Sequence, residues 1–108
     1  MKVLVYVFVE IENVGKAINA LSEAEITGFF LYEYKGMSPQ DWKGFLIDEA
    51  PEAAVNAIKN LAKNAVVIGT VVSEEKFLKI KKYINEKLSN EKYTIIAVPV
   101  VDIKVNVV

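Results

Sequence analysis

The side chains that could do chemistry in this sequence are lysines and carboxylates. Its 108 residues include no His and no Cys, and all 13 basic residues are Lys. Without His and Cys the chain cannot form a Ser-His-Asp triad, a thiolate nucleophile or a zinc site built on those ligands. No pair of carboxylates can be placed convincingly across one cleft either. We therefore expect a binding protein and not an enzyme.

Two clusters of charged residues could have a function. Several lysines within residues 74–88 could bind an anion or a partner, and the carboxylates within residues 48–52 could bind a hard cation. In both places a solvated helix surface is the simpler interpretation, so we predict no metal site. The net charge of −1 and the lack of Arg disfavour nucleic-acid binding.

The composition also bears on where the protein works. The absence of cysteine is typical of an intracellular chain. No stretch approaches the roughly 18 apolar residues of a membrane span. We therefore expect a cytoplasmic protein that does not span a membrane.

A strand–helix–strand pattern occurs twice along the chain. Each unit has an amphipathic run between two apolar stretches, and the successive segments are 3–9, 13–25 and 29–34, then 65–72, 74–88 and 94–101. Two such units predict an α+β, ferredoxin-like split βαβ sandwich. The link between them, residues 35–64, holds a further predicted helix at 51–63, which begins at Pro51. We expect residues 1–108 to form a single domain with this link as an insertion.

The predicted strands are apolar on both faces. Residues 3–9 are apolar at every position, whereas a sheet with one solvated face should alternate apolar and polar residues. Burying each large apolar side chain contributes roughly 1.5–3 kcal/mol, so both faces should be covered. Either the link helix or another subunit must cover the second face, and we infer a homo-oligomer. Residues 103–108 do alternate, which is typical of an edge strand or an intersubunit strand.

The densest local signal is residues 26–40, ITGFFLYEYKGMSPQ. A turn that contains Gly28 enters an apolar strand, the strand ends at Lys35 and Gly36, and a loop follows. Here the chain resembles the PII nitrogen-regulatory signalling proteins. Their corresponding stretch reads ITG, an apolar strand, and then E-x-K-G-x-G-R-Q at the root of a long T-loop. The matching positions are Ile26-Thr27-Gly28, Glu33, Lys35-Gly36 and Gln40, and a more distant similarity is to the CutA family.

The resemblance implies a homotrimer with inward-facing sheets and with ligand sites in the clefts between subunits. Carried over residue by residue, the ligand-binding positions are Gly28, Lys35, Gly36 and Gln40. Gln40 falls where the family contacts a 2-oxoacid and a metal beside the nucleotide. The implied ligand is a small anion, with an adenine nucleotide as the candidate cofactor. The implied partner is a regulated enzyme or transporter that binds through residues 37–64.

Two departures from the family leave an alternative open. The family's glycine-rich phosphate-binding loop, TGKIGDGK, is replaced by residues 89–94, SNEKYT, which contain no Gly to let backbone N–H groups approach phosphate. The link also carries Trp42 and Phe45, which could anchor a partner or could pack the link onto the sheet. The alternative is therefore an oligomeric interaction module that has lost the nucleotide site.

Overall fold

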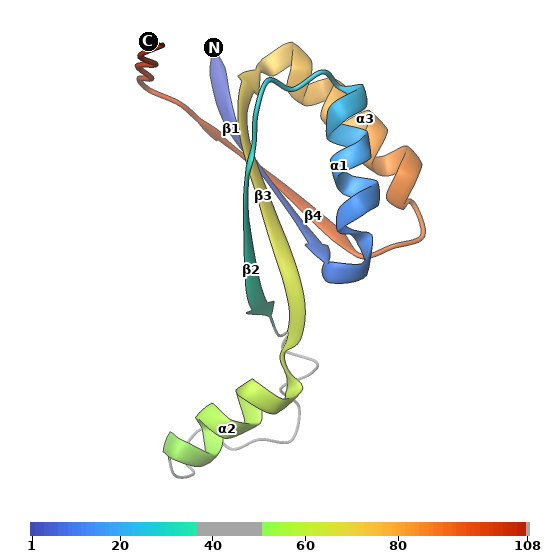
Figure 1. Ribbon diagram of the computed structural model, residues 1–108, viewed down its shortest axis with the longest axis vertical. Helices are drawn as coiled ribbons and strands as arrows, with labels where there is room; N and C mark the ends of the chain where they lie inside the picture. The colour runs from blue at the N-terminus through green and yellow to red at the C-terminus, as the bar shows by residue number, and fades with distance from the viewer. Residues whose placement is uncertain (37–50, 108) are drawn as a thin grey trace.

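The computed structural model describes residues 1–36 and 51–107, except for the side chains of Ala54, Ala57, Ile58 and Leu61. In chain order, its elements are β1 (Lys2–Glu10), the 3-10 turn η1 (Ile11–Asn13), α1 (Val14–Glu23), β2 (Phe30–Gly36), α2 (Pro51–Leu61), β3 (Lys63–Ser73), α3 (Glu74–Leu88) and β4 (Tyr93–Pro99). The strands form one antiparallel sheet in the order β2-β3-β1-β4. Helices α1 and α3 lie together on one face of it (Figure 1). This confirms the predicted ferredoxin-like α+β sandwich.

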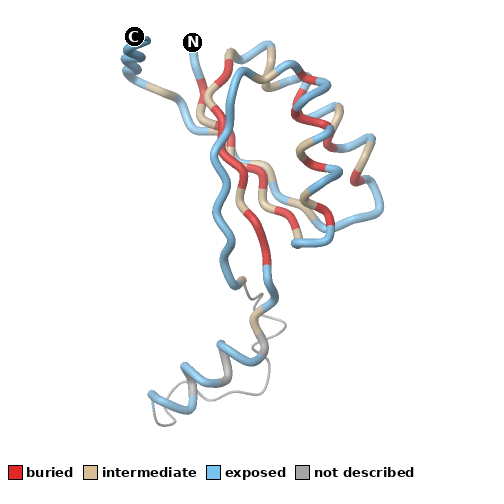
Figure 2. Tube along the Cα trace, in the orientation of Figure 1, coloured by how far each residue is buried: buried red, intermediate tan, exposed pale blue. Residues whose placement is uncertain are grey.

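The hydrophobic core lies between that face and the two helices. Alternate residues of β1 point into it, and Figure 2 shows the buried positions along β1 and β3 and along the inner sides of the helices. Its members are Val3, Val5, Val7, Val9, Ala17, Ala20, Leu21, Ala24, Val66, Ile68, Val72, Ile80, Ile84 and Leu88. The helical and strand periodicities of the sequence thus meet in a single apolar layer.

The helices over the sheet begin and end for identifiable reasons. Helix α3 has the predicted bounds, and the Ser73 hydroxyl caps it by accepting a hydrogen bond from the Lys76 N–H at 3.1 Å. Helix α1 ends two residues before the predicted limit because Glu25 adopts a left-handed conformation, with φ of 61°. The Ile26 N–H then bonds to the Leu21 carbonyl at 3.4 Å, as in a Schellman motif.

We expect Ser73→Ala to lower the free energy of unfolding by about 1 kcal/mol, because the Lys76 N–H loses the hydroxyl oxygen that accepts its hydrogen bond at the start of α3. Urea denaturation at fixed protein concentration measures this change. Ser73→Asp is the matched control, since a carboxylate can also cap and suits the positive end of the helix dipole. Equal losses in both variants would contradict a capping role.

The strand ends follow from pairing rather than from local apolarity. β3 is longer than the predicted 65–72 because it pairs with both β1 and β2, from Lys63 opposite Gly36 to Ser73 opposite Lys2. α2 therefore ends at Leu61, before the predicted residue 63. β4 ends at Pro99, opposite Val3 and short of the predicted residue 101; beyond it, a single hydrogen bond at 3.0 Å from the Val100 N–H to the Lys2 carbonyl continues the contact with β1. β2 lies one residue later than predicted at its start and two later at its end.

Two segments extend beyond the sandwich. Helix α2 projects away from the far end of the sheet, and residues 101–107 run out beside the N-terminus (Figure 1). Residues 103–107 form no strand with this chain's own sheet, so the edge-strand interpretation is wrong and the intersubunit interpretation stays a prediction. Their exposed apolar side chains are Ile103, Val105 and Val107. None of the described helices combines the length and apolarity that crossing a membrane requires.

Candidate functional site

The face of the sheet opposite the helices is apolar and open in the protomer. Its register places Tyr6 beside Gly69 and Ile96, and Phe8 beside Val67 and Thr94. Large apolar side chains on this face remain accessible to solvent in the protomer: Tyr32 is 63% exposed and Ile96 is 46% exposed. The described part of α2 does not cover this face, since it extends past the end of the sheet (Figure 1). The prediction that the link helix covers this face is therefore not met by its described residues, and a cover by another subunit stays a prediction.

Aromatic rings dominate the open face. Tyr6 contacts Phe8 and Phe30, Phe8 contacts Tyr34, and Phe30 contacts Tyr32, with ring centroids 5.7 to 6.3 Å apart. Three of these pairs are edge-to-face, a preferred geometry for aromatic contacts. The Phe30 ring lies over Gly69, at a place where any Cβ would overlap it. The open face therefore carries a contiguous group of aromatic rings that contact one another within the protomer.

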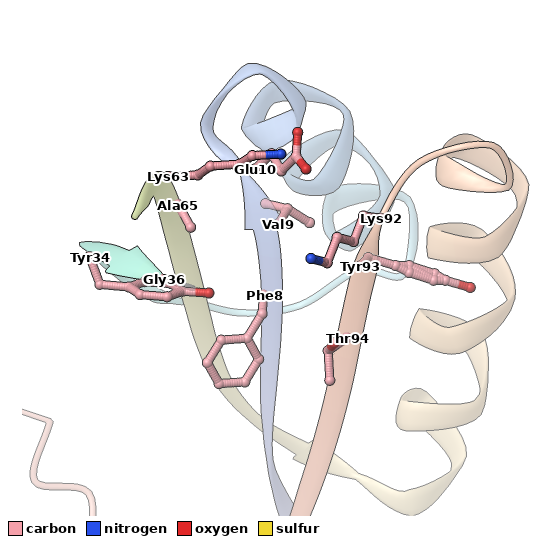
Figure 3. Close-up of a pocket in the computed structure, with 10 residues that line it drawn as sticks. All are labelled: Phe8, Val9, Glu10, Tyr34, Gly36, Lys63, Ala65, Lys92, Tyr93 and Thr94. Atoms are coloured by element: carbon pink, nitrogen blue, oxygen red, sulfur yellow. The ribbon is translucent and has the colours of Figure 1, made fainter. Parts of the chain in front are cut away.

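A hollow of about 280 Å³ opens at the end of this face, next to the link (Figure 3). Its walls come from all the strands of the sheet and from the residue before β4. The lining residues are Phe8, Val9, Glu10, Tyr34, Gly36, Lys63, Ala65, Lys92, Tyr93 and Thr94.

Antiparallel pairing brings these residues together. β1 and β2 end at this edge of the sheet, while β3 and β4 begin there. Gly36 pairs with Lys63, and Val9 pairs with Tyr93. Gly36 is suited to its place, because a Cβ there would meet the Tyr34 ring at 2.9 Å. The hollow thus combines an aromatic wall, made by Phe8 and Tyr34, with charged groups at its rim.

The charges at the rim are two ammonium groups and a carboxylate. Figure 3 shows Lys63 extending toward Glu10, with Lys92 across the hollow. A hydrogen bond with Glu12 raises the pKa of Glu10 above its usual value, as does the charge of Glu12, while Lys63 and Lys92 act against this rise. A hydrogen bond from its own backbone N–H lowers the pKa of Glu12. The arrangement can attract an anion while keeping one carboxylate close to it.

The structure separates the residues that the sequence assigned to a ligand. Gly36 lines the hollow. Lys35 belongs to the opposite face of β2, and its Nζ donates to the Lys59 carbonyl at 3.3 Å. Gly28 lies before the start of β2, at the opposite end of that strand from the hollow. Its carbonyl accepts a hydrogen bond from the Thr70 hydroxyl at 2.6 Å. Gln40 lies outside the described residues, as do Trp42 and Phe45.

Sequence reasoning missed most of the residues that line the hollow. Lys63, Lys92 and Glu10 are far apart in the chain and belong to no local motif. The predicted topology could have indicated them, because each of the three lies at or next to the end of a strand. In an antiparallel sheet, the C-terminal ends of some strands lie beside the N-terminal ends of their neighbours. Among the described residues, no group of three or more carboxylates could hold a metal ion.

Comparisons with known proteins agree with this architecture. A family described as "Uncharacterized protein, homolog of nitrogen regulatory protein PII" matches residues 1–107. The protein MJ1244 of Methanocaldococcus jannaschii is 67% identical over 106 residues, which span 98% of each chain.

Two solved structures share the fold at 10% sequence identity. A DUF3240 family protein from Shewanella baltica OS155 has a TM-score of 0.71, with 98% of this chain and 97% of that chain covered. CPII from Thiomonas intermedia K12 is described as a nitrogen regulatory PII-like protein bound to ADP, AMP and bicarbonate. It has a TM-score of 0.67, with 96% of each chain covered. The chain belongs to the family of homologues of nitrogen regulatory protein PII.

Proposed function

We propose that this protein is a homotrimeric, PII-like regulatory protein that binds a small anionic ligand, an adenine nucleotide, in clefts between its subunits. The observation that carries the proposal is the hollow in which Lys63 and Lys92 stand beside the aromatic wall of Phe8 and Tyr34. Ammonium groups suit a phosphate, and an aromatic wall suits a purine ring. The family and the nucleotides bound to CPII support the choice of ligand.

The proposed trimer accounts for the open apolar face. Tyr32 and Ile96 remain substantially exposed in a protomer whose other sheet face holds the hydrophobic core. Covering the face with a second copy contributes roughly 1.5–3 kcal/mol for each large side chain that becomes buried. The hollow opens onto this same face, so a neighbouring subunit would complete its wall.

The ligand-binding positions taken from the family remain part of the proposal. Gly36 and Gln40 would contact the ligand at the root of the link. Gly28 stands beyond the far end of β2, about 25 Å from Gly36 at the usual rise per residue, so it would reach a hollow only from a neighbouring subunit. Lys35 faces away from this hollow and would likewise have to act in a different cleft.

The proposed output of the protein is regulation of an enzyme or transporter through residues 37–64. Helix α2 supports this, because it projects from the same end of the sheet as the hollow (Figure 1). The Lys35 ammonium bonds to the Lys59 carbonyl and thereby joins β2 to α2. A ligand that moves the end of β2 would also move this helix. Trp42 and Phe45 are the proposed anchors for the partner.

We expect Lys63→Met and Lys92→Met each to weaken nucleotide binding about tenfold, because each removes one charge-assisted contact to phosphate. Isothermal titration calorimetry with AMP, ADP and ATP measures the dissociation constants. Lys79→Met, on the exposed surface of α3, is the matched control and should leave binding unchanged. Equal weakening in all three variants would point to net charge instead of a site.

The second candidate is an oligomeric interaction module that has lost its nucleotide site. The lack of Gly in residues 89–94 favours it, because a side-chain-lined turn restricts the approach of phosphate to backbone N–H groups. A nucleotide that binds only the native state raises the melting temperature. A thermal-shift panel of AMP, ADP, ATP and 2-oxoglutarate, with and without Mg²⁺, therefore separates the candidates. If none of these ligands raises the melting temperature, the interaction module is favoured.

A further inference from the structure

The rim of the hollow contains a carboxylate that an anion site does not need. Glu10 is the last residue of β1 and lines the hollow together with Lys63 and Lys92. With all three groups ionised, their summed charge is +1, from two ammonium groups and one carboxylate. That balance suits a single phosphoryl group far better than a di- or triphosphate, whose additional charges would have to approach Glu10.

We propose that Glu10 determines ligand specificity, selecting a ligand with one phosphoryl group over its di- and triphosphate analogues. This inference rests on the proposed function, because it assigns the nucleotide class at the same hollow. Lys63 and Lys92 attract the phosphoryl group from β3 and from the turn before β4, while Glu10 repels any further phosphate from β1. Specificity then comes from a repulsive element as well as from the attractive ones.

The groups around Glu10 should make the selectivity for one phosphoryl group depend on pH. The charged and titratable groups that act on it are Glu12 on η1, Lys63 on β3 and Lys92 before β4. Its pKa is raised mainly through Glu12, so it takes up a proton at a higher pH than an ordinary glutamate. A bound phosphate raises that pKa further, because nearby negative charge disfavours the ionised form. Binding of polyphosphates should therefore tighten as the pH falls, and the preference for one phosphoryl group should shrink.

Glu10→Gln tests the inference. Calorimetric dissociation constants for AMP, ADP and ATP, without Mg²⁺ and at constant ionic strength, are compared between wild type and variant near pH 7 and near pH 5. We expect the variant to improve ATP binding relative to AMP binding by about fivefold at neutral pH, since a like charge at contact distance in water has about that effect. The phosphates themselves titrate in this range, so the difference between the two proteins is what is interpreted.

Glu33→Gln is the matched control, since it removes the same charge from β2 on the opposite face of the sheet. It should leave the ratio of ATP to AMP binding unchanged. Melting temperatures of all variants verify that each one folds.

The outcomes separate the inference from the proposed function. An altered ratio in Glu10→Gln alone, together with a weaker dependence on pH, supports the inference. Nucleotide binding with the same ratio in wild type and Glu10→Gln overturns the inference and leaves the proposed function intact. No binding by either protein at either pH overturns both.

Discussion

Replacing Ile96 with lysine is expected to dissociate the proposed trimer into protomers of 12.1 kDa. Ile96 lies on the open face directly opposite Tyr6, and it is 46% exposed in the protomer. The protomer should therefore tolerate lysine at this position. In a trimer the same ammonium would be buried without a partner, at an effective cost of several kcal/mol per ion. Light scattering coupled to size-exclusion chromatography measures the mass of the assembly.

Leu78→Lys is the control for this prediction. Leu78 is a large apolar residue that is 61% exposed on α3, so the substitution has the same chemistry on a helix that faces away from the open sheet face. We expect it to leave the mass unchanged. A trimer that survives Ile96→Lys would mean that this face is covered in some other way. A mass that corresponds to one chain for the wild type would contradict the oligomer altogether.

The second large effect is expected at Gly69. A Cβ on this residue would overlap the Phe30 ring, and the overlap involves three ring atoms. Because the ring is also packed against Tyr6 and Tyr32, it cannot swing away without losing edge-to-face contacts. We expect Gly69→Ala to lower the free energy of unfolding by about 1–3 kcal/mol, as overpacking of a tight site does. Urea denaturation at one fixed protein concentration measures the change.

Two further variants make the test of Gly69 specific. Gly15→Ala, in α1, introduces the same methyl group where nothing lies within 4 Å, and it should stabilise the protein by about 1 kcal/mol through helix propensity. Phe30→Ala removes the ring, so Gly69→Ala should cost much less in that background. Additive losses in the double variant would show that the ring and the methyl group do not compete for the same space.

Much of the fold could be predicted from local pattern. The two strand–helix–strand units, the bounds of α3 and the Ser73 cap all follow from periodicity and side-chain chemistry within a few residues. The PII-like family could be predicted from residues 26–40, and the whole-chain family match confirms it. Apolarity on both faces of the strands also indicated that a second cover was needed, because local composition reports how many faces of a strand are buried.

Element ends and the candidate site needed the tertiary structure. β3 extends beyond its apolar run because it has partners on both sides, whereas the apolar run of β4 continues past its last paired residue, Pro99. Pairing also decides that Gly36, Lys63, Glu10 and Lys92 meet at one edge, although no local motif links them.

The assignment of Lys35 and Gly36 to one ligand site shows most clearly what local sequence could not predict. They are adjacent in the sequence and in the family motif, yet alternate residues of a strand point to opposite faces of the sheet. Gly36 therefore lines the hollow, while the Lys35 ammonium reaches the Lys59 carbonyl. The sequence by itself determined the family and the layers, and it predicts a cover for the second face of the sheet. Only the tertiary structure decided which charges face one another, because that depends on strand register and not on spacing along the chain.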